Sequence, residues 1–289
     1  MMTRSMYNKY LKPFMLALLL MAVVPVAFSG NRPKVGLALG GGGAKGAATI
    51  GVLKAIEEAG IKVDFIAGTS IGAIIGGLYA SGVSLSTIEE LFYSQEFRTI
   101  LNGRGMEYQF EELLAEYGCE QFCDTRIPFC CVAADYDKLE EIVFSSGSLS
   151  KAMRVSMSIP VIYKPVHWNG RRLVDGGLVN NLPVDVVKNM GADIVIAVDL
   201  QQGEESEFDI PMHKLLGEGP LARWLHKRPD VKRHRMNKEL ADIYIQPDLR
   251  GFSVASFDRY YCEEMTDRGY EEAKGMWSQL VQLRKQQNN

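Results

Sequence analysis

The sequence predicts an α/β protein with a mainly parallel central sheet, and two observations support this prediction. Apolar runs typical of buried strands alternate with helix-like runs from residue 34 onward, which is the pattern of successive β-α units. Glycine-rich loops follow the first two of these strand-like runs. Because open α/β sheets carry their sites at the carboxyl ends of the strands, we expect the functional residues at that edge.

The first 29 residues are expected to precede the folded domain. Three basic residues and no acidic residue come before an apolar run over residues 14–28, and small residues follow next to Gly30. This arrangement is typical of a secretory signal peptide. The apolar run is about 15 residues long, shorter than the ~20 residues of a membrane-spanning helix, and an uncleaved anchor is the alternative. We therefore expect export to the periplasm or out of the cell.

Residues 30–289 are long enough to form one large domain with its own core. The formal net charge of the whole chain is −3, and removing the three basic residues of segment 1–29 makes it about −6. This mildly acidic balance gives no indication of a nucleic-acid partner. It leaves the oligomeric state undetermined.

Cysteine usage argues against a disulfide framework and against a metal site. The chain has five cysteines, and an odd number in an exported protein leaves at least one thiol unpaired. Cys119 and Cys123 are either a disulfide or two thiols on one helical turn. Cys130 and Cys131 are adjacent in a strand-like run, so their side chains point to opposite faces and do not share a metal. We expect no metal and no cofactor.

A glycine loop, Gly40–Gly46, follows the first strand-like run and leads into a helical pattern with Ile50, Leu53 and Ile56 on one side. Three interpretations of this loop compete. It fits the dinucleotide-binding pattern G-x-G-x-x-G, with Asp64 at the distance of the acid that binds the ribose. It lacks the Gly-Lys-Ser/Thr ending of a P-loop, which argues against a nucleoside triphosphate.

The third interpretation of the loop is an oxyanion hole. In it, the backbone amides of Gly41, Gly42 and Gly43 bind the carbonyl oxygen of an ester under attack. This interpretation requires a nucleophile close by. The dinucleotide interpretation leaves the next motif of the chain unexplained, whereas the oxyanion-hole interpretation gives a role to both the glycine loop and that motif.

That next motif is Gly68-Thr-Ser70-Ile-Gly72, between a strand-like run that starts at Val63 and a helix-like run over residues 73–80. The G-x-S-x-G pattern predicts a sharp strand-to-helix turn, where glycines allow close backbone approach and the serine accepts strained dihedral angles. The free amides of the helix N-terminus favour negative charge. The pattern places Ser70 as a nucleophile, although the same pentapeptide also occurs as a simple connection.

The middle of the chain predicts further helices and strands before a hairpin. We expect a capping box at Ser86–Glu89 to open a helix through Tyr93. We expect, in order, a helix over residues 107–117, strands over 127–134 and 139–144, and a helix over 148–158 that ends before Pro160. Met153 and Met157 lie on one face of that last helix, in the core or along an adaptable lipid pocket.

A carboxylate lies at the end of the predicted hairpin. Asn169-Gly170 is a strong signal for a tight hairpin turn, and the second strand leads into Asp175-Gly176-Gly177. An aspartate before two glycines is commonly a turn residue that caps its own backbone. Coupled to Ser70 it has a second interpretation, as the general base that takes the serine proton.

The last third predicts a helical run to Met190, a strand over residues 192–199, a late strand over 241–247 and a charged helix over 262–287 that docks on the sheet. Residues 201–238 are expected to run over the surface in contact with solvent, and the part from His213 to His234 is expected to be loop. Their basic part, residues 223–238, either is solvated or contacts an anionic lipid surface. The chain's histidines are His167, His213, His226 and His234, and none lies in a motif, so a two-residue Ser-Asp site is favoured over a triad.

Taken together, the stretches Gly41–Gly46, Gly68–Gly72 and Asp175–Gly177 resemble the patatin-like phospholipase family in order and spacing. The resemblance covers residues 34–200 strongly and the late strand and final helix more loosely. It implies a three-layer α/β/α sandwich in which Ser70 is the nucleophile and Asp175 the proton acceptor of a dyad. It also implies that Gly41, Gly42 and Gly43 form the oxyanion loop, with Lys45 at the family's Arg or Lys position.

The implied activity is metal-free hydrolysis of acyl esters of lipids through an acyl-serine intermediate. A lipid or phospholipid is then the substrate, with a peripheral contact to a membrane left open. Two rival functions are a dinucleotide-binding protein and a catalytically silent lipid-binding protein. The motifs do not select the lipid class, the acyl position or the chain length.

Overall fold

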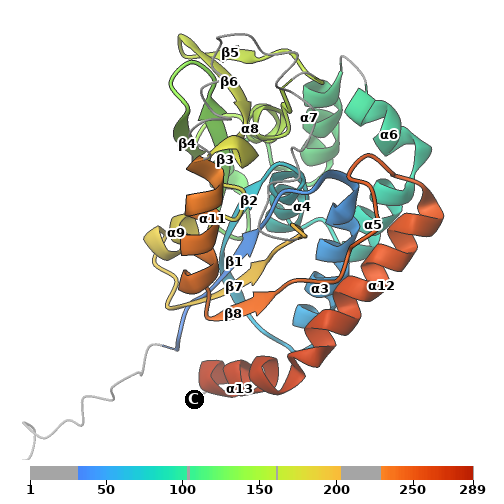
Figure 1. Cartoon of the computed structure of the whole chain (residues 1–289), viewed down its shortest axis with the longest axis vertical. Coiled ribbons are helices and arrows are strands. Elements are labelled where there is room, and N and C mark those ends of the chain that lie inside the picture. Colours follow the sequence, from blue (N-terminus) through green and yellow to red (C-terminus); the bar gives the residue numbers. More distant parts are fainter. Residues whose placement is uncertain (1–31, 103–104, 161, 203–228, 289) are drawn as a thin grey trace, which may run out of the picture. The chain divides into compact units, whose positions relative to one another are not determined.

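A sheet of eight strands forms the centre of the described part of the chain (Figure 1). The computed structural model describes residues 32–102, 105–160, 162–202 and 229–288. Pro33–Asn289 forms one unit and Met1–Arg32 another. The predicted signal peptide, residues 1–29, lies outside the described residues and stays a prediction.

Five strands of the sheet run parallel, in the spatial order β3, β2, β1, β7, β8. They are β1 (Val35–Leu39), β2 (Val63–Thr69), β3 (Phe129–Asp135), β7 (Ile194–Val198) and β8 (Ile243–Ile245). An antiparallel group extends the sheet beside β3 and consists of β4 (Glu140–Phe144), β5 (Val166–Trp168) and β6 (Arg171–Asp175). The predicted mainly parallel α/β sheet is confirmed.

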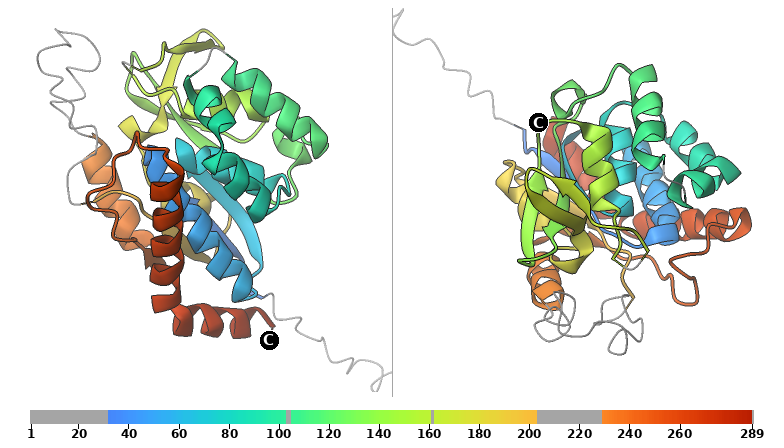
Figure 2. Two further views of the ribbon diagram at one scale, coloured as in Figure 1. Left: turned by 90° about the vertical axis from the view of Figure 1, so that its right-hand side faces the viewer. Right: turned by 90° about the horizontal axis from the view of Figure 1, so that it is seen from above.

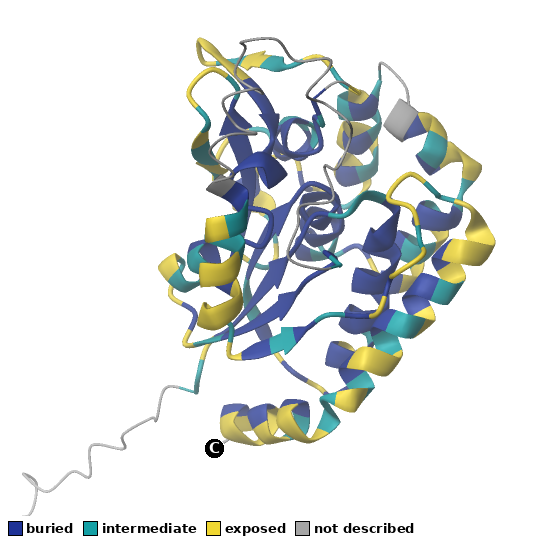
Figure 3. Ribbon diagram, in the orientation of Figure 1, coloured by how far each residue is buried: buried dark blue, intermediate teal, exposed yellow. Residues whose placement is uncertain are grey.

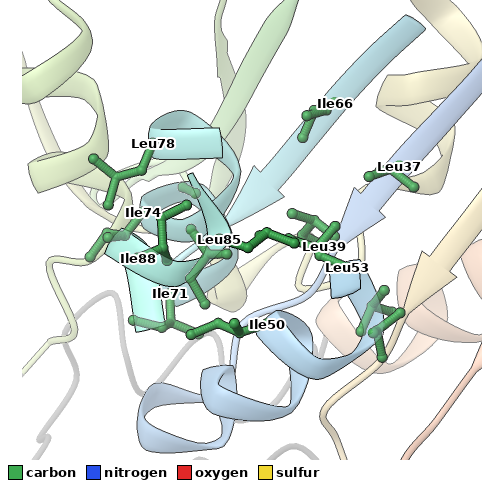
Figure 4. Close-up of a cluster of buried hydrophobic side chains, with 14 of the residues drawn as sticks. Leu37, Leu39, Ile50, Leu53, Ile66, Ile71, Ile74, Leu78, Leu85 and Ile88 are labelled. Atoms are coloured by element: carbon green, nitrogen blue, oxygen red, sulfur yellow. The ribbon is translucent and has the colours of Figure 1, made fainter. Parts of the chain in front are cut away.

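Helices cover both faces of this sheet, because alternate strand residues point to opposite sides. On one face, Leu37, Leu39 and Ile66 pack with helices α3 (Gly46–Glu58), α4 (Ile71–Ala80) and α5 (Leu85–Tyr93), as Figure 4 shows. On the other face, Ala38 and Ala67 pack with α9 (Val184–Asn189). The two cores confirm the three-layer sandwich. Exposed residues gather on the outer sides of the helices, and the parallel strands are largely buried (Figure 3).

The predicted final helix is two helices, α12 (Arg259–Gly275) and α13 (Trp277–Asn288), and their buried side chains belong to the same apolar core as those of β7 and β8. Helix α12 lies along α3, which already covers the sheet (Figures 1 and 2). A Cβ at Gly51 would lie 1.9 Å from the Thr266 carbonyl oxygen, and one at Gly269 would lie 2.0 Å from that of Ala48. The two glycines let the backbones of α3 and α12 approach closely.

Two further sequence predictions are corrected. Helix α5 begins at Leu85, and its cap is Ser84, whose Oγ accepts the Thr87 amide at 3.1 Å; the predicted capping box at Ser86–Glu89 is wrong. Residues predicted as loop form the helix α11 (Pro229–Leu240). The remaining helices are α6 (Gln95–Asn102), α7 (Met106–Glu116) and α8 (Leu149–Ser156). Within the described ranges, no helix has the length and apolar composition needed to cross a membrane.

Candidate active site

Ser70 stands alone at a sharp turn between β2 and α4. Strand β2 ends at Thr69 and α4 begins at Ile71, and the backbone of Ser70 has φ 56° and ψ −124°. A positive φ is strained for a residue with a side chain, and such strain is found where function requires a fixed geometry. A Cβ at Gly68 would lie 2.3 Å from the Gly72 carbonyl oxygen, so this turn requires glycine there.

The structure brings Ser70 and Asp175 into direct contact although 105 residues separate them. Ser70 Oγ donates a hydrogen bond to Asp175 Oδ2 at 2.6 Å. The other carboxylate oxygen, Oδ1, accepts the Gly177 amide at 2.8 Å. The backbone amide of Asp175 donates to the Ser158 carbonyl at 2.9 Å. Asp175 is fully buried at the end of β6, where the hairpin delivers it, and both carboxylate oxygens are occupied.

Burial decides the acidity of this carboxyl group. Removing the charged form from water raises the pKa of Asp175 to about 7, although hydrogen bonds from Ser70 and Gly177 lower it. A base with a pKa near neutrality is well matched to proton transfer at neutral pH. The geometry and the electrostatics both suit a group that accepts and returns the serine proton.

The end of helix α8 and the residue after it supply two contacts that sequence reasoning did not assign to the site. Ser156 Oγ accepts the backbone amide of Ser70 at 2.9 Å and donates to the Val132 carbonyl at 2.6 Å. Met157 Sδ lies 3.3 Å from Ser70 Oγ. The spacing of Met153 and Met157 on one helical face is a sequence signal that could have pointed to Met157. Ser156 lies in no motif, and its role depends on a contact between segments that are distant in the sequence.

The glycine loop passes against Ser70, but one of its amides is already used. A Cβ at Gly41 would lie 3.0 Å from Ser70 Cβ and 2.4 Å from Asn181 Oδ1. The Gly41 amide donates to the Asn181 carbonyl at 3.1 Å, and Asn181 Nδ2 donates back to the Gly41 carbonyl at 3.3 Å. The Gly41 amide is therefore engaged within the protein, and the predicted oxyanion role of the loop stays a prediction.

The other motif residues surround the same turn. Among the described residues, the amides of Gly42 and Gly43 donate no hydrogen bond. Lys45 is buried at the end of the short 3₁₀ turn after the loop. A Cβ at Gly46 would lie 2.5 Å from Ile71 Cγ1, and one at Gly176 would lie 2.4 Å from the Val132 carbonyl oxygen. The loop, the serine turn and the Asp175 turn therefore pack closely on one another.

A polar network on the α9 side ties the serine turn to α11. Thr69 Oγ1 donates to the Asn180 carbonyl at 2.9 Å, and Asn237 Nδ2 donates to Asn180 Oδ1 at 2.9 Å. Asn237 Oδ1 accepts the Asp185 amide at 3.0 Å. Arg233 contacts the carboxylates of both Glu141 and Asp185 at 2.6 Å. Helix α11 thus anchors the segment that follows the Asp175 turn.

The dinucleotide interpretation conflicts with the position of Asp64. Asp64 Oδ2 accepts the Val35 amide at 2.9 Å, and Val35 pairs with Val63 where both strands begin. The glycine loop follows the opposite end of β1, after Leu39. Since each strand residue advances about 3.3 Å, the carboxylate lies at the far edge of the sheet and does not meet a ribose beside the loop.

The described histidines contact neither Ser70 nor Asp175. His167 is exposed on β5, and His234 Nε2 lies 2.9 Å from Asp199 Oδ2, a separate carboxylate that also accepts the Tyr244 hydroxyl at 2.5 Å. His213 and His226 lie outside the described residues. All five cysteines are free thiols, and no group of potential metal ligands is found in the described part of the chain.

The sequence matches one family model, that of patatin-like phospholipase, over residues 37–126 and 131–188. It is 38% identical over 192 residues to patatin-like phospholipase domain-containing protein ZK370.4 of Caenorhabditis elegans, which covers 60% of this chain and 14% of that protein. It is 37% identical over 180 residues to lysophospholipase nte1 of Aspergillus fumigatus, covering 57% of this chain and 12% of the relative.

A longer match is to neuropathy target esterase sws of Drosophila melanogaster, at 29% identity over 290 residues, covering 86% of this chain and 20% of the relative. The chain therefore spans a fifth or less of the length of these relatives. Two solved structures share its fold at 15% identity. VipD from Legionella pneumophila has a TM-score of 0.56 and covers 86% of this chain and 67% of its own. ExoU from Pseudomonas aeruginosa, in complex with SpcU, has a TM-score of 0.53 and covers 87% and 53%.

Proposed function

This chain belongs to the patatin-like phospholipase family, and we propose on that basis that it hydrolyses acyl esters of lipids with Ser70 and Asp175 as its catalytic dyad. The observation that carries the proposal is the 2.6 Å hydrogen bond between Ser70 Oγ and Asp175 Oδ2 at a strained strand-to-helix turn. The names of two relatives, a lysophospholipase and an esterase, support an ester substrate.

In the acylation step, Ser70 Oγ attacks the ester carbonyl carbon and its proton passes to Asp175 Oδ2 along the existing hydrogen bond. The tetrahedral intermediate collapses, the bond to the alcohol oxygen breaks, and Asp175 returns the proton to the leaving alcohol. In deacylation, Asp175 takes a proton from water while the water oxygen attacks the acyl-serine. The fatty acid leaves and Ser70 regains its proton.

The oxyanion of each tetrahedral intermediate needs hydrogen-bond donors next to Ser70. We assign this role to the amides of Gly42 and Gly43, because the Gly41 amide is held by the Asn181 carbonyl. Preorganised donors of this kind are each worth roughly 10²–10³ in rate. The bond from Ser156 Oγ to the Ser70 amide holds the nucleophile's backbone in place while the charge develops.

Export and membrane contact extend the proposal. The basic and then apolar pattern of residues 1–29 supports export through a signal peptide, to the periplasm or out of the cell. A lipid substrate supports peripheral contact with a membrane. Expression of the full chain, followed by amino-terminal sequencing of the exported form, tests the first point, and an unprocessed cytoplasmic product would contradict it.

The dyad is tested with the folded protein and a series of aryl and phospholipid esters of increasing acyl length. Ser70→Ala and Asp175→Asn should each lose hydrolysis, whereas the exposed controls Ser278→Ala and Asp267→Asn should keep it. Retained turnover in Asp175→Asn would contradict the dyad. Folded wild-type protein that binds fatty acid but cleaves no ester would instead support the silent lipid-binding alternative.

A further inference from the structure

Arg154, on α8, is a half-buried cation that contacts no carboxylate of the described residues. Its Nη1 donates to Ser158 Oγ at 2.5 Å, and its guanidinium carbon lies 4.9 Å from the centre of the Tyr163 ring. Among the described residues, no acidic side chain comes within ion-pair distance, since Glu107 on α7 acts on it only at longer range. The guanidinium group has five N–H donors, and some of them therefore have no acceptor among the described residues.

Arg233 shows how the fold compensates the charge of another partly buried arginine. Arg233 is also partly buried, and it contacts two carboxylates at 2.6 Å, those of Glu141 and Asp185. Removing a cation from water is costly unless an anion compensates it. Burial lowers the pKa of Arg154, while the nearby Tyr163 and Glu107 raise it. The described neighbours of Arg154 therefore place no carboxylate in ion-pair contact with its charge.

Arg154 also lies beside the dyad. The next residues of the same segment, Ser156 and Met157, contact Ser70 directly. The carbonyl of Ser158, whose hydroxyl binds Arg154, accepts the Asp175 amide at 2.9 Å. A single residue thus links the guanidinium to the catalytic aspartate.

The pKa of Tyr163 also indicates that Arg154 and Asp175 lie near each other. Burial raises the pKa of Tyr163, the Arg154 cation lowers it, and the Asp175 charge raises it. The Asp175 pKa itself is set by burial, Ser70 and Gly177. Arg154 therefore lies near the Asp175 carboxylate without neutralising its charge. This position suits a group that binds a neighbouring part of the substrate.

We propose that Arg154, stacked on Tyr163, binds the phosphate of a phospholipid or lysophospholipid headgroup while the acyl carbonyl of the same molecule lies at Ser70. This inference rests on the proposed function and names the substrate class of that site. Guanidinium groups recognise phosphate through paired, charge-assisted hydrogen bonds, and the headgroup supplies an anion that the described residues do not provide. Arg154 then selects phosphate-bearing esters over neutral glycerides.

Two substrates that differ only in the headgroup test this proposal. These are 1-palmitoyl-lysophosphatidylcholine and 1-palmitoylglycerol, presented at equal mole fraction in the same detergent micelles. In Arg154→Gln, the ratio of kcat/KM for the phosphate ester to that for the neutral ester should fall about tenfold or more, the effect expected for lost charged hydrogen bonds, mainly through KM. Arg154→Lys should restore part of the ratio, because it keeps the charge without the paired donors.

Arg284→Gln is the matched control. The Arg284 side chain lies against Gly60, just before β2, whereas Ser70 follows the other end of that strand. The substrate ratio should therefore stay at the wild-type value. Thermal unfolding of each variant shows whether it is folded.

The outcomes separate the two proposals. Wild-type protein that cleaves neither ester contradicts the proposed function. Wild-type protein that cleaves both, with an unchanged ratio in Arg154→Gln, contradicts the headgroup site alone. An equal loss on both esters also contradicts it and assigns Arg154 to positioning Ser158 and Asp175. A free phosphate site would instead show as inorganic phosphate changing neutral-ester kinetics in the wild type only, with the substrate ratio unaltered.

Discussion

The side chains of Asn180 and Asn237 are joined by a 2.9 Å hydrogen bond, which couples helix α11 to the segment after Asp175. Both residues are essentially fully buried. The Asn180 carbonyl in turn accepts a hydrogen bond from the hydroxyl of Thr69, the residue before Ser70. Helix α11, which is distant in sequence, thus holds the Ser70 turn and the Asp175 turn in position relative to each other.

Replacing Asn237 should weaken this coupling. Asn237→Leu removes the donor to Asn180 and the acceptor for the Asp185 amide, leaving buried polar groups unpaired. We expect a loss of about 1–3 kcal/mol in the free energy of unfolding, measured with urea, and a lower kcat. The exposed Met236→Ala on the same helix should change stability by less than about 0.5 kcal/mol. Equal stability of the two variants would contradict the coupling.

The rate of hydrolysis should depend on the ionisation of Asp175. Burial raises its pKa to about 7, and only the deprotonated carboxylate accepts the serine proton. We therefore expect kcat/KM for a non-ionising ester to rise with pH through about 7 and to level off above it. A flat profile between pH 5 and pH 8 would show that another group is the base.

The same pKa makes a prediction about stability. Because the folded pKa lies above the ordinary value of 3.8, the folded state binds more protons than the unfolded state between about pH 4 and pH 7. The contribution of Asp175 to stability therefore falls as pH rises through this window. Urea unfolding at pH 5 and pH 8 should show Asp175→Asn gaining stability relative to the wild type at the higher pH. A constant difference would argue against a buried, shifted carboxyl group.

The close approach of the glycine loop to the nucleophile predicts a strong effect at Gly41. A Cβ there would overlap Asn181 Oδ1 and press on Ser70 Cβ, so the loop must move. Gly41→Ala should lower kcat at least about tenfold, since it displaces the neighbouring oxyanion donors. Gly105→Ala, where a Cβ meets nothing within 4 Å, is the matched control and should keep wild-type kinetics.

Thiol accessibility tests the state of the cysteines. Cys123 is exposed, while Cys119, Cys130, Cys131 and Cys262 are buried. Burial also raises the pKa of Cys130 to about 11, which slows its reaction further. A thiol reagent should modify one residue rapidly in the folded protein and all five after denaturation without reductant. Only three reactive thiols in the denatured protein would reveal a Cys119–Cys123 disulfide.

Prediction from sequence worked where short segments carry their own signal. The strand before Ser70, the turn at Asn169-Gly170 and helix α7 are set by local periodicity and by turn residues, and all three are found. It failed at α11, because that helix docks through Arg233 and Asn237 and not through an apolar stripe. Polar anchoring leaves no hydrophobic period to detect.

Helix capping shows a second limit. Ser84 and Ser86 are both acceptable caps in sequence, and the structure uses Ser84 because its hydroxyl meets the Thr87 amide. The choice depends on where the chain leaves the preceding turn. Local composition permits either serine, so only the path of the backbone decides.

The sequence by itself determined the α/β class, the strand-to-helix turn at Ser70 and the glycines that this turn requires, because close backbone packing leaves few residue types acceptable. Only the tertiary structure decided that Asp175 meets Ser70, that the Gly41 amide belongs to Asn181, and that Ser156 and Arg154 stand beside the dyad. These contacts join segments distant in the chain. Their partners are chosen by the packing of strands and helices, which no local pattern encodes.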